Sequence, residues 1–170
     1  MGQEITDLAD LERIKGIYDR QAGRVYRTAM VYMRNSEDAE DIVQSVFMTL
    51  IEKGIVFSDF EHEKAWMITA ARNRCIDMLK SAWRSRTDMG DEALRAAEEQ
   101  GESPGADEAE QLSSLLMQLP EEQREILLLH YYEGYTVDEV AAMTGRKESG
   151  IRSAIASAKR TLRKIRDGRK

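Results

Sequence analysis

With 170 residues, of which 42% are hydrophobic, the chain is long enough to build one ordinary domain or two small ones with compact cores. Its formal net charge is −6, and no apolar run approaches the roughly 18 residues that a membrane span needs, so we expect a soluble cytoplasmic protein without membrane insertion. One cysteine, Cys75, and two distant histidines, His62 and His130, exclude a disulfide framework and a zinc site of usual ligand spacing.

Charge is distributed unevenly along the chain. Residues 64–86 carry six Lys or Arg against one Asp, and residues 87–111 carry nine acidic residues against one Arg. Residues 146–170 then carry ten Lys or Arg against two acidic residues. Two basic segments therefore flank an acidic one, so the negative net charge does not exclude a nucleic-acid partner.

Helical periodicity dominates the first 54 residues, whereas strand signals are scarce along the whole chain. Residues 8–35 predict one or two helices. Their expected core positions are Leu11, Ile14, Tyr18, Val25, Ala29 and Tyr32. Residues 36–54 predict a further helix, with Ser36 as its N-cap and Gly54 at its end. The apolar stripe of that helix leaves four residues facing outward, namely Asp38, Asp41, Ser45 and Met48.

Residues 55–63 predict a short connection, and helical spacing resumes over residues 64–86. The inward stripe of this helix is Ile68, Cys75, Leu79 and Ala82. Its other face is polar and basic and is headed by an aromatic residue, with the order Trp66, Ala70, Asn73, Asp77, Lys80 and Arg84. A solvated helix face, with Trp66 and Trp83 as core anchors, explains this pattern as well as a nucleic-acid contact does.

The acidic segment that follows has no aromatic and no β-branched aliphatic residue, and it contains the chain-breaking sequence "GESPG". We predict a flexible acidic linker over residues 88–109, between a first domain of residues 1–87 and a second domain of residues 110–170.

The last third of the chain predicts a helix-turn-helix. A short apolar stripe comes first, made of Leu112, Leu115, Leu116 and Leu119. Pro120 suits a first helical turn and Gly134 suits the end of that helix. The sequence from Thr136 to Glu139 is a capping box that opens a helix of about two turns, and Gly145 permits the tight turn after it. The basic helix that follows at once would enter the major groove of DNA.

Catalysis fits the sequence poorly. The chain contains no Gly-rich phosphate loop, no nucleophile elbow and no metal-spaced His pair. We therefore expect no enzyme, no catalytic residue, no metal and no cofactor. Two basic helices joined by a tether favour two DNA contacts made by one chain.

Three motifs resemble, in the right order, the extracytoplasmic-function (ECF) sigma factors of bacterial RNA polymerase. They are "DAEDIVQSVF", "AWMITAARNRCIDMLK" and "LPEEQREILLLHYYEGYTVDEVAAMTG". The resemblance implies an all-α fold with two small helical domains: sigma region 2, and a region 4 helix-turn-helix. It also implies three partners: core RNA polymerase, through its beta-prime clamp and beta flap, promoter DNA, and an anti-sigma factor.

The same resemblance implies roles for residues in each domain. The expected polymerase contacts are Asp38, Asp41, Gln44, Ser45 and Met48. The expected contacts to the minus-ten element are Ser58, Asp59, Phe60, Trp66, Asn73, Asp77, Lys80, Arg84 and Arg86. Among these, the segment "VFSDFEHE" matches the loop that captures a flipped base in this family. The expected contacts to the minus-thirty-five element are Arg146, Lys147, Ser149, Arg152, Ser153, Ser157, Lys159 and Arg160.

The start of the basic helix departs from the family pattern. Relatives carry Thr-Val-Lys-Ser-Arg there and further arginines one turn later. This chain has Gly150, Ile151, Arg152, Ser153 and Ala154, followed by Ser157 and Lys159. Two other hypotheses therefore stay open: a stand-alone helix-turn-helix regulator with an N-terminal sensing or dimerisation domain, and a polymerase-binding adaptor that no longer reads promoters.

Overall fold

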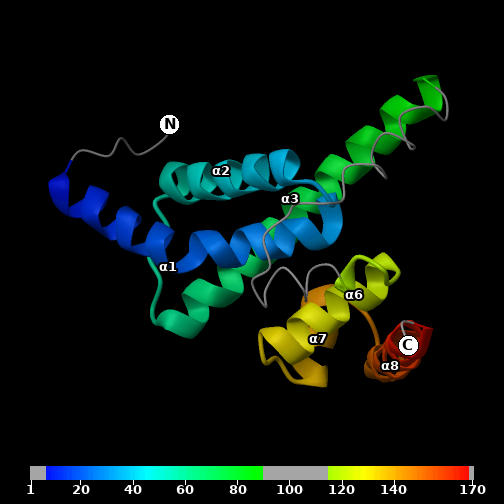
Figure 1. Cartoon of the computed structure of the whole chain (residues 1–170). Helices are drawn as coiled ribbons and strands as arrows, with labels where there is room; N and C mark the ends of the chain where they lie inside the picture. Colours follow the sequence, from blue (N-terminus) through cyan, green and yellow to red (C-terminus); the bar gives the residue numbers. More distant parts are fainter. Residues whose placement is uncertain (1–6, 90–114, 169–170) are drawn as a thin grey trace. The chain divides into compact units, whose positions relative to one another are not determined.

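The computed structural model describes residues 7–89 and 115–168, and all of its regular elements in those ranges are helices (Figure 1). The chain divides into two compact units, Met1–Glu102 and Ser103–Lys170. The all-α prediction is confirmed. The predicted linker of residues 88–109 lies outside the described residues, except for its first two residues, which continue a helix.

The first unit contains α1 (Leu8–Met33), α2 (Ser36–Lys53) and α3 (Phe60–Met89). Helix α1 packs against both α2 and α3, which also contact each other (Figure 1). The core between them is apolar and includes Ile17, Val25, Ala29, Ile42, Val46, Leu50, Met67, Ile68 and Cys75. Burial of these side chains is the main force that holds the three helices together.

Two details of α1 and α2 differ from the sequence predictions. Leu11 and Tyr18 are 50% and 48% exposed, so their assignment to the core is wrong. The N-cap of α2 is Asn35 rather than Ser36, because the Asn35 Oδ1 atom accepts a hydrogen bond of 2.8 Å from the N–H group of Asp38. The Asn35 Nδ2 group also donates to the Asp38 carboxylate at 2.8 Å.

The C-terminus of α2 is where the sequence placed it. Gly54 adopts φ 58°, a left-handed conformation that L side chains rarely adopt, and its N–H group bonds back to the last turn of α2. Helix α3 begins at Phe60, four residues before the predicted start, so the connection consists of residues 54–59. Asp59 explains the early start, because its Oδ1 atom accepts a hydrogen bond of 2.8 Å from the N–H group of His62.

The second unit contains α6 (Glu121–Leu127), the wider π-helical turn η1 (Leu128–Tyr132), α7 (Val137–Thr144) and α8 (Glu148–Gly168). Its core includes Leu116, Leu119, Leu127 and Ala158, against which Leu162 packs. Leu112, the first residue of the predicted apolar stripe, lies outside the described residues. No local pattern in the sequence predicts the π-helical turn.

The predicted helix-turn-helix is present as α7, a short turn and α8. Thr136 caps α7: its hydroxyl accepts from the N–H group of Glu139 at 3.2 Å and donates to the Glu139 carboxylate at 3.1 Å. Gly145 ends α7 with φ 70°, which supplies the tight turn. Helix α8 then begins three residues later.

Residues 7–89 and 115–168 contain no group of three or more His, Cys, Asp or Glu side chains placed to hold a metal ion. None of the helices in those same ranges combines the length and the apolar character that crossing a membrane requires.

Candidate functional site

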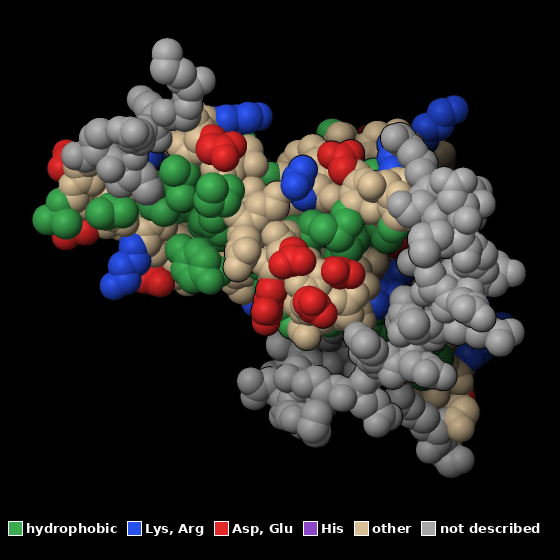
Figure 2. Space-filling model, turned by 90° about the horizontal axis from the view of Figure 1, so that it is seen from above, with side chains coloured by type: hydrophobic (Ala, Val, Ile, Leu, Met, Phe, Trp, Pro, Cys, Tyr) green, Lys and Arg blue, Asp and Glu red, His purple; other side chains and the backbone are tan. Residues whose placement is uncertain are grey.

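The outward side of α2 carries the five residues predicted to bind polymerase. Asp41, Gln44 and Met48 are exposed, whereas Asp38 and Ser45 are half-buried. Acidic side chains gather beside apolar ones on the face of the molecule where α2 lies (Figure 2). The structure thus brings these residues together on one surface, and none of the five is in the core.

An apolar area adjoins those acidic side chains. Met48 on α2 is 53% exposed, and Leu11 and Tyr18 on α1 are similarly exposed. The Tyr18 ring rests against the ring of Phe47, with 4.9 Å between the centroids, so its position is fixed by packing. An exposed apolar area bordered by charge is typical of a protein-binding surface.

The connection between α2 and α3 presents Ser58 and Asp59, and α3 begins with Phe60; all three residues are exposed. Its turn is closed by His62, whose Nδ1 atom accepts a hydrogen bond of 3.2 Å from the N–H group of Ser58. The Phe57 ring packs edge-on against the His62 ring at 5.2 Å, which adds an apolar contact to the polar ones.

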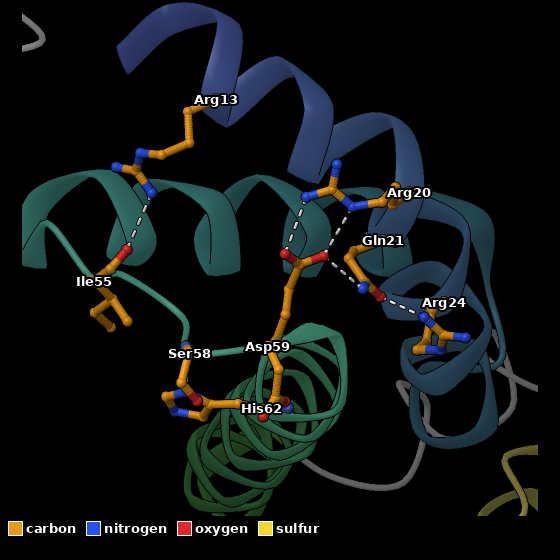
Figure 3. A network of polar contacts seen from close by, with 9 residues as sticks. Arg13, Arg20, Gln21, Arg24, Ile55, Ser58, Asp59 and His62 are labelled. Carbon is orange, nitrogen blue, oxygen red and sulfur yellow. Dashed lines mark hydrogen bonds and ion pairs between the residues drawn. The ribbon is translucent and has the colours of Figure 1, made fainter. Parts of the chain in front are cut away.

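A polar network links α1 to the first turn of α3 (Figure 3). Glu63, only 6% exposed, accepts hydrogen bonds from Arg20 Nε at 3.1 Å, from Arg20 Nη2 at 3.0 Å and from Gln21 Nε2 at 2.8 Å. Gln21 Oε1 in turn accepts from Arg24, whose guanidinium carbon lies 5.7 Å from the centre of the Phe60 ring. No local sequence pattern indicates this network, because the residues that it joins across the two helices are 42 and 43 positions apart.

The pKa values of the two charged partners move in opposite directions. Burial by itself would raise the pKa of Glu63, but the hydrogen bonds from Arg20 and Gln21 and the positive charge of Arg20 hold the pKa below its usual value. The hydrogen bond with Glu63 raises the pKa of Arg20. The pair therefore stays charged at neutral pH.

The polar face of α3 is placed as the sequence predicted. Three expected contacts are exposed on it, namely Asn73, Asp77 and Lys80. Trp66 is half-buried, and its ring lies 5.7 Å from that of Phe57, so it borders the connection. Arg84 and Arg86 belong to α3, but their side chains lie outside the described residues.

Helix α8 has an apolar side and a polar side. The side packed into the second unit carries Ile151, Ile155 and Ala158. Exposed positions that were predicted to contact DNA are Lys147, Ser149, Arg152, Ser153, Lys159 and Arg160. Ser157 is half-buried, and its Oγ atom accepts a hydrogen bond of 3.1 Å from Arg160 Nη2.

Arg146 stands apart from the other predicted contacts. It is half-buried, with Nη1 at 3.4 Å from Glu125 Oε2 and Nε at 3.6 Å from Glu122 Oε1. The Glu125 side chain is only 4% exposed, so this contact ties the turn of the helix-turn-helix to α6. A role in folding thus accompanies the predicted role of Arg146 in DNA binding.

Two acidic residues at the helix-turn-helix were not selected from the sequence. Glu148, the first residue of α8, shares a hydrogen bond with Asp138 on α7, and this bond together with the negative charge of Asp138 raises the pKa of Glu148. The Glu148 carboxylate also lies 3.5 Å from Arg152 Nη2. The start of the predicted recognition helix therefore presents negative as well as positive charge.

Comparison with known proteins identifies the family. The model for sigma-70 region 2 matches residues 17–85, and the model for sigma-70, region 4, matches residues 109–162. The ECF RNA polymerase sigma factor SigL of Mycobacterium tuberculosis is 29% identical over 159 residues, which cover 91% of this chain and 89% of the relative. The two sigma-70 models together match more than half of the chain, which therefore belongs to the sigma-70 family and is similar to ECF sigma factors. This sigma factor is also 26% identical over 138 residues to RNA polymerase sigma factor SigV of Bacillus subtilis, covering 81% of each chain.

Solved structures share the fold of this sigma factor. The sigma factor RpoE of Bartonella quintana, in a structure titled as a complex with the anti-sigma factor NepR, matches with a TM-score of 0.70 and 20% identity over 92% of this chain and 98% of the other. CnrH, in a structure titled as a complex with the cytosolic domain of CnrY, matches with a TM-score of 0.60 and 19% identity over 93% and 90%.

The matched regions divide the candidate site between the two units of this sigma factor. Region 2 includes the outward face of α2, the connection and α3 up to residue 85, so Arg86 lies one residue beyond it. Region 4 includes α6, α7 and most of α8. The resemblance stated from the sequence is confirmed, and the chain is a transcription-initiation factor with a DNA-binding region 4.

Proposed function

We propose that this sigma factor binds core RNA polymerase and directs it to two-part promoters, with the first unit engaging the minus-ten element and α8 the minus-thirty-five element. The observation that carries the proposal is the pattern of exposure in α8. Its apolar residues Ile151, Ile155 and Ala158 face the core, which leaves the basic and hydroxyl side chains on the side that is free to enter a groove.

Polymerase binding is assigned to the acidic and apolar surface of α2. Asp41 and Gln44 offer charge and hydrogen bonds to a basic partner helix such as one of the beta-prime clamp, and Met48 offers apolar area at the centre. The beta flap is the proposed partner of the second unit. The same α2 surface, extended by Leu11 and Tyr18, suits an anti-sigma factor that would compete with polymerase.

Promoter opening is assigned to the connection and to α3. Ser58, Asp59 and Phe60 are exposed at the turn, and Asn73, Asp77 and Lys80 continue along α3. Taking up a flipped base is least costly in DNA that has already melted, so these residues would act together with strand separation. They bind DNA and break no covalent bond.

Transcription in vitro with core enzyme and a library of promoter fragments tests the proposal. We expect new start sites that depend on this protein. A polymerase-binding adaptor would bind core enzyme and yield none, and a stand-alone regulator would bind duplex DNA tightly without core enzyme. The region 2 match over residues 17–85 already gives the first unit a role that the stand-alone regulator leaves unexplained.

A further inference from the structure

The connection of residues 54–59 is attached to α1 near both of its ends (Figure 3). At its start, Arg13 Nη1 donates a hydrogen bond of 3.2 Å to the carbonyl oxygen of Ile55. Just past its end, the buried carboxylate of Glu63 accepts hydrogen bonds of 2.8 to 3.1 Å from Arg20 and Gln21. A single helix therefore fixes the distance between the two ends of this connection.

Most of the connection is exposed, apart from Phe57, whose ring packs against the rings of His62 and Trp66. Val56 is 72% exposed, and Ser58 and Asp59 are exposed as well, as is Phe60 just past the connection. The turn is closed locally by hydrogen bonds to the backbone and ring of His62. A short segment of this kind keeps one shape only if its ends are held.

The contact at Glu63 is strong enough to hold one end. Its carboxylate is nearly removed from water, and it accepts three hydrogen bonds, of which two come from the fork of one guanidinium. Bidentate charge-assisted pairs combine strength with a defined geometry. The network continues through Gln21 to Arg24, whose guanidinium group lies over the Phe60 ring. It therefore reaches the first residue after the connection.

We infer that Arg13, Arg20, Gln21 and Glu63 are positioning residues that hold the connection in the shape in which it takes up promoter DNA. This inference rests on the proposed function, because it assigns the network a role in promoter use. Holding the segment before binding removes the entropy loss that DNA would otherwise have to offset, which corresponds to about a tenfold gain in affinity for each residue kept ordered.

Hydrogen exchange of the free full-length protein, followed by mass spectrometry, tests the geometry. Three variants probe it: Glu63→Ala, Glu63→Gln, which keeps the side-chain volume, and Arg13→Ala, which acts on the other end. The matched control is Ile42→Ala, which opens a cavity under the first half of α2, twelve residues before the connection begins. We expect faster exchange at the amides of Ser58 and His62 in the first three variants, least in Glu63→Gln, and no local increase in the control.

Transcription with core polymerase, from a promoter mapped with the unchanged protein, tests the role. We expect initiation to fall about tenfold in Arg13→Ala and Glu63→Ala, and less in Glu63→Gln, while the control keeps its activity below its melting temperature. Unchanged exchange at the connection would overturn the inference. Faster exchange with full transcription would overturn it too, since the network would then serve stability alone. If the unchanged protein itself yields no start site, the proposed function fails, and the exchange result still decides whether α1 holds the connection.

Discussion

The Glu63 network makes a prediction about stability that can be worked out from its contacts. Hydrogen bonds to a charged group contribute about 1.5 to 3 kcal/mol each when considered singly, and breaking a buried pair costs about 3 to 5 kcal/mol. Here the three bonds share one carboxylate, and the Arg20 side chain is 49% exposed, so solvent screens part of the attraction. We expect Glu63→Ala to destabilise the first unit by about 3 kcal/mol, Arg20→Ala by about 1 kcal/mol, and the pair to be coupled by about 1 kcal/mol.

Tryptophan fluorescence suits this measurement. Both tryptophans of the chain, Trp66 and Trp83, belong to α3, so their emission reports the unfolding of the first unit and not of the second. A loss of about 3 kcal/mol lowers the melting temperature of a domain of this size by about 12 to 24 °C. A coupling energy below about 0.3 kcal/mol in the double-mutant cycle would refute the reasoning, because the carboxylate would then be screened as a surface group is.

The pH dependence of Glu63 has a definite sign. Its pKa is lowered in the folded protein, so its contribution to the free energy of unfolding is fully present above the unfolded value of about 4.3 and is lost as the pH falls through the lower folded value. The difference in stability between the unchanged protein and Glu63→Gln should therefore be constant from pH 7 to about pH 5.5 and should shrink below about pH 4. A difference that grows on acidification would contradict the assigned direction.

Three further predictions concern other parts of the chain. Arg152→Ala should lower the slope of log affinity against log salt for holoenzyme and promoter by about 0.9, and an unchanged slope would mean that Arg152 contacts no phosphate. Glu148→Gln should raise promoter affinity at pH 7, because it removes a negative charge from the proposed DNA-binding side of α8. Acidification should raise the promoter affinity of the unchanged protein, by protonating Glu148, but not that of the variant. An equal gain in affinity in both proteins would exclude Glu148 as its source. Met48→Asp should weaken core polymerase binding at least tenfold, measured by fluorescence anisotropy, with no change in melting temperature, and intact binding would remove Met48 from the interface.

The sequence predicted a helix boundary correctly only where a single residue could end or cap the helix. Gly54 and Gly145 marked helix ends correctly, because a left-handed backbone favours glycine strongly. Ser36 is a good cap residue by type, but so is Asn35, and the cap is the side chain that reaches the N–H group of Asp38. The sequence predicts a later start for α3, because Asp59 falls within the predicted connection, whereas its side chain caps the helix.

The candidate site was predictable to the extent that it lies on helix faces. Periodicity placed Asn73 and Lys80 on the outside of α3, as the structure does. The same periodicity put Tyr18 in the core, since an exposed apolar residue next to the core stripe produces the same pattern as a core residue. The bond between Arg20 and Glu63 joins residues 43 positions apart, and neither helix by itself carries any sign of it.

The charges at the start of α8 suggest how much of the promoter affinity comes from the sigma factor alone and how much comes from its attachment to core polymerase. The guanidinium of Arg152 lies 3.5 Å from the carboxylate of Glu148, so part of its attraction to phosphate is already cancelled before DNA arrives. Asp138 adds a further carboxylate beside Glu148, and the whole chain has a net charge of −6.

Since phosphate contacts supply most of the affinity of non-specific binding, the free protein should bind duplex promoter weakly. Core polymerase, by holding the first unit near the minus-ten element, would raise the effective concentration of α8 at its own site. Sequence selection can then come from a weakly binding helix, and tight, specific gel-shift binding by the protein without core enzyme would show that this division is wrong.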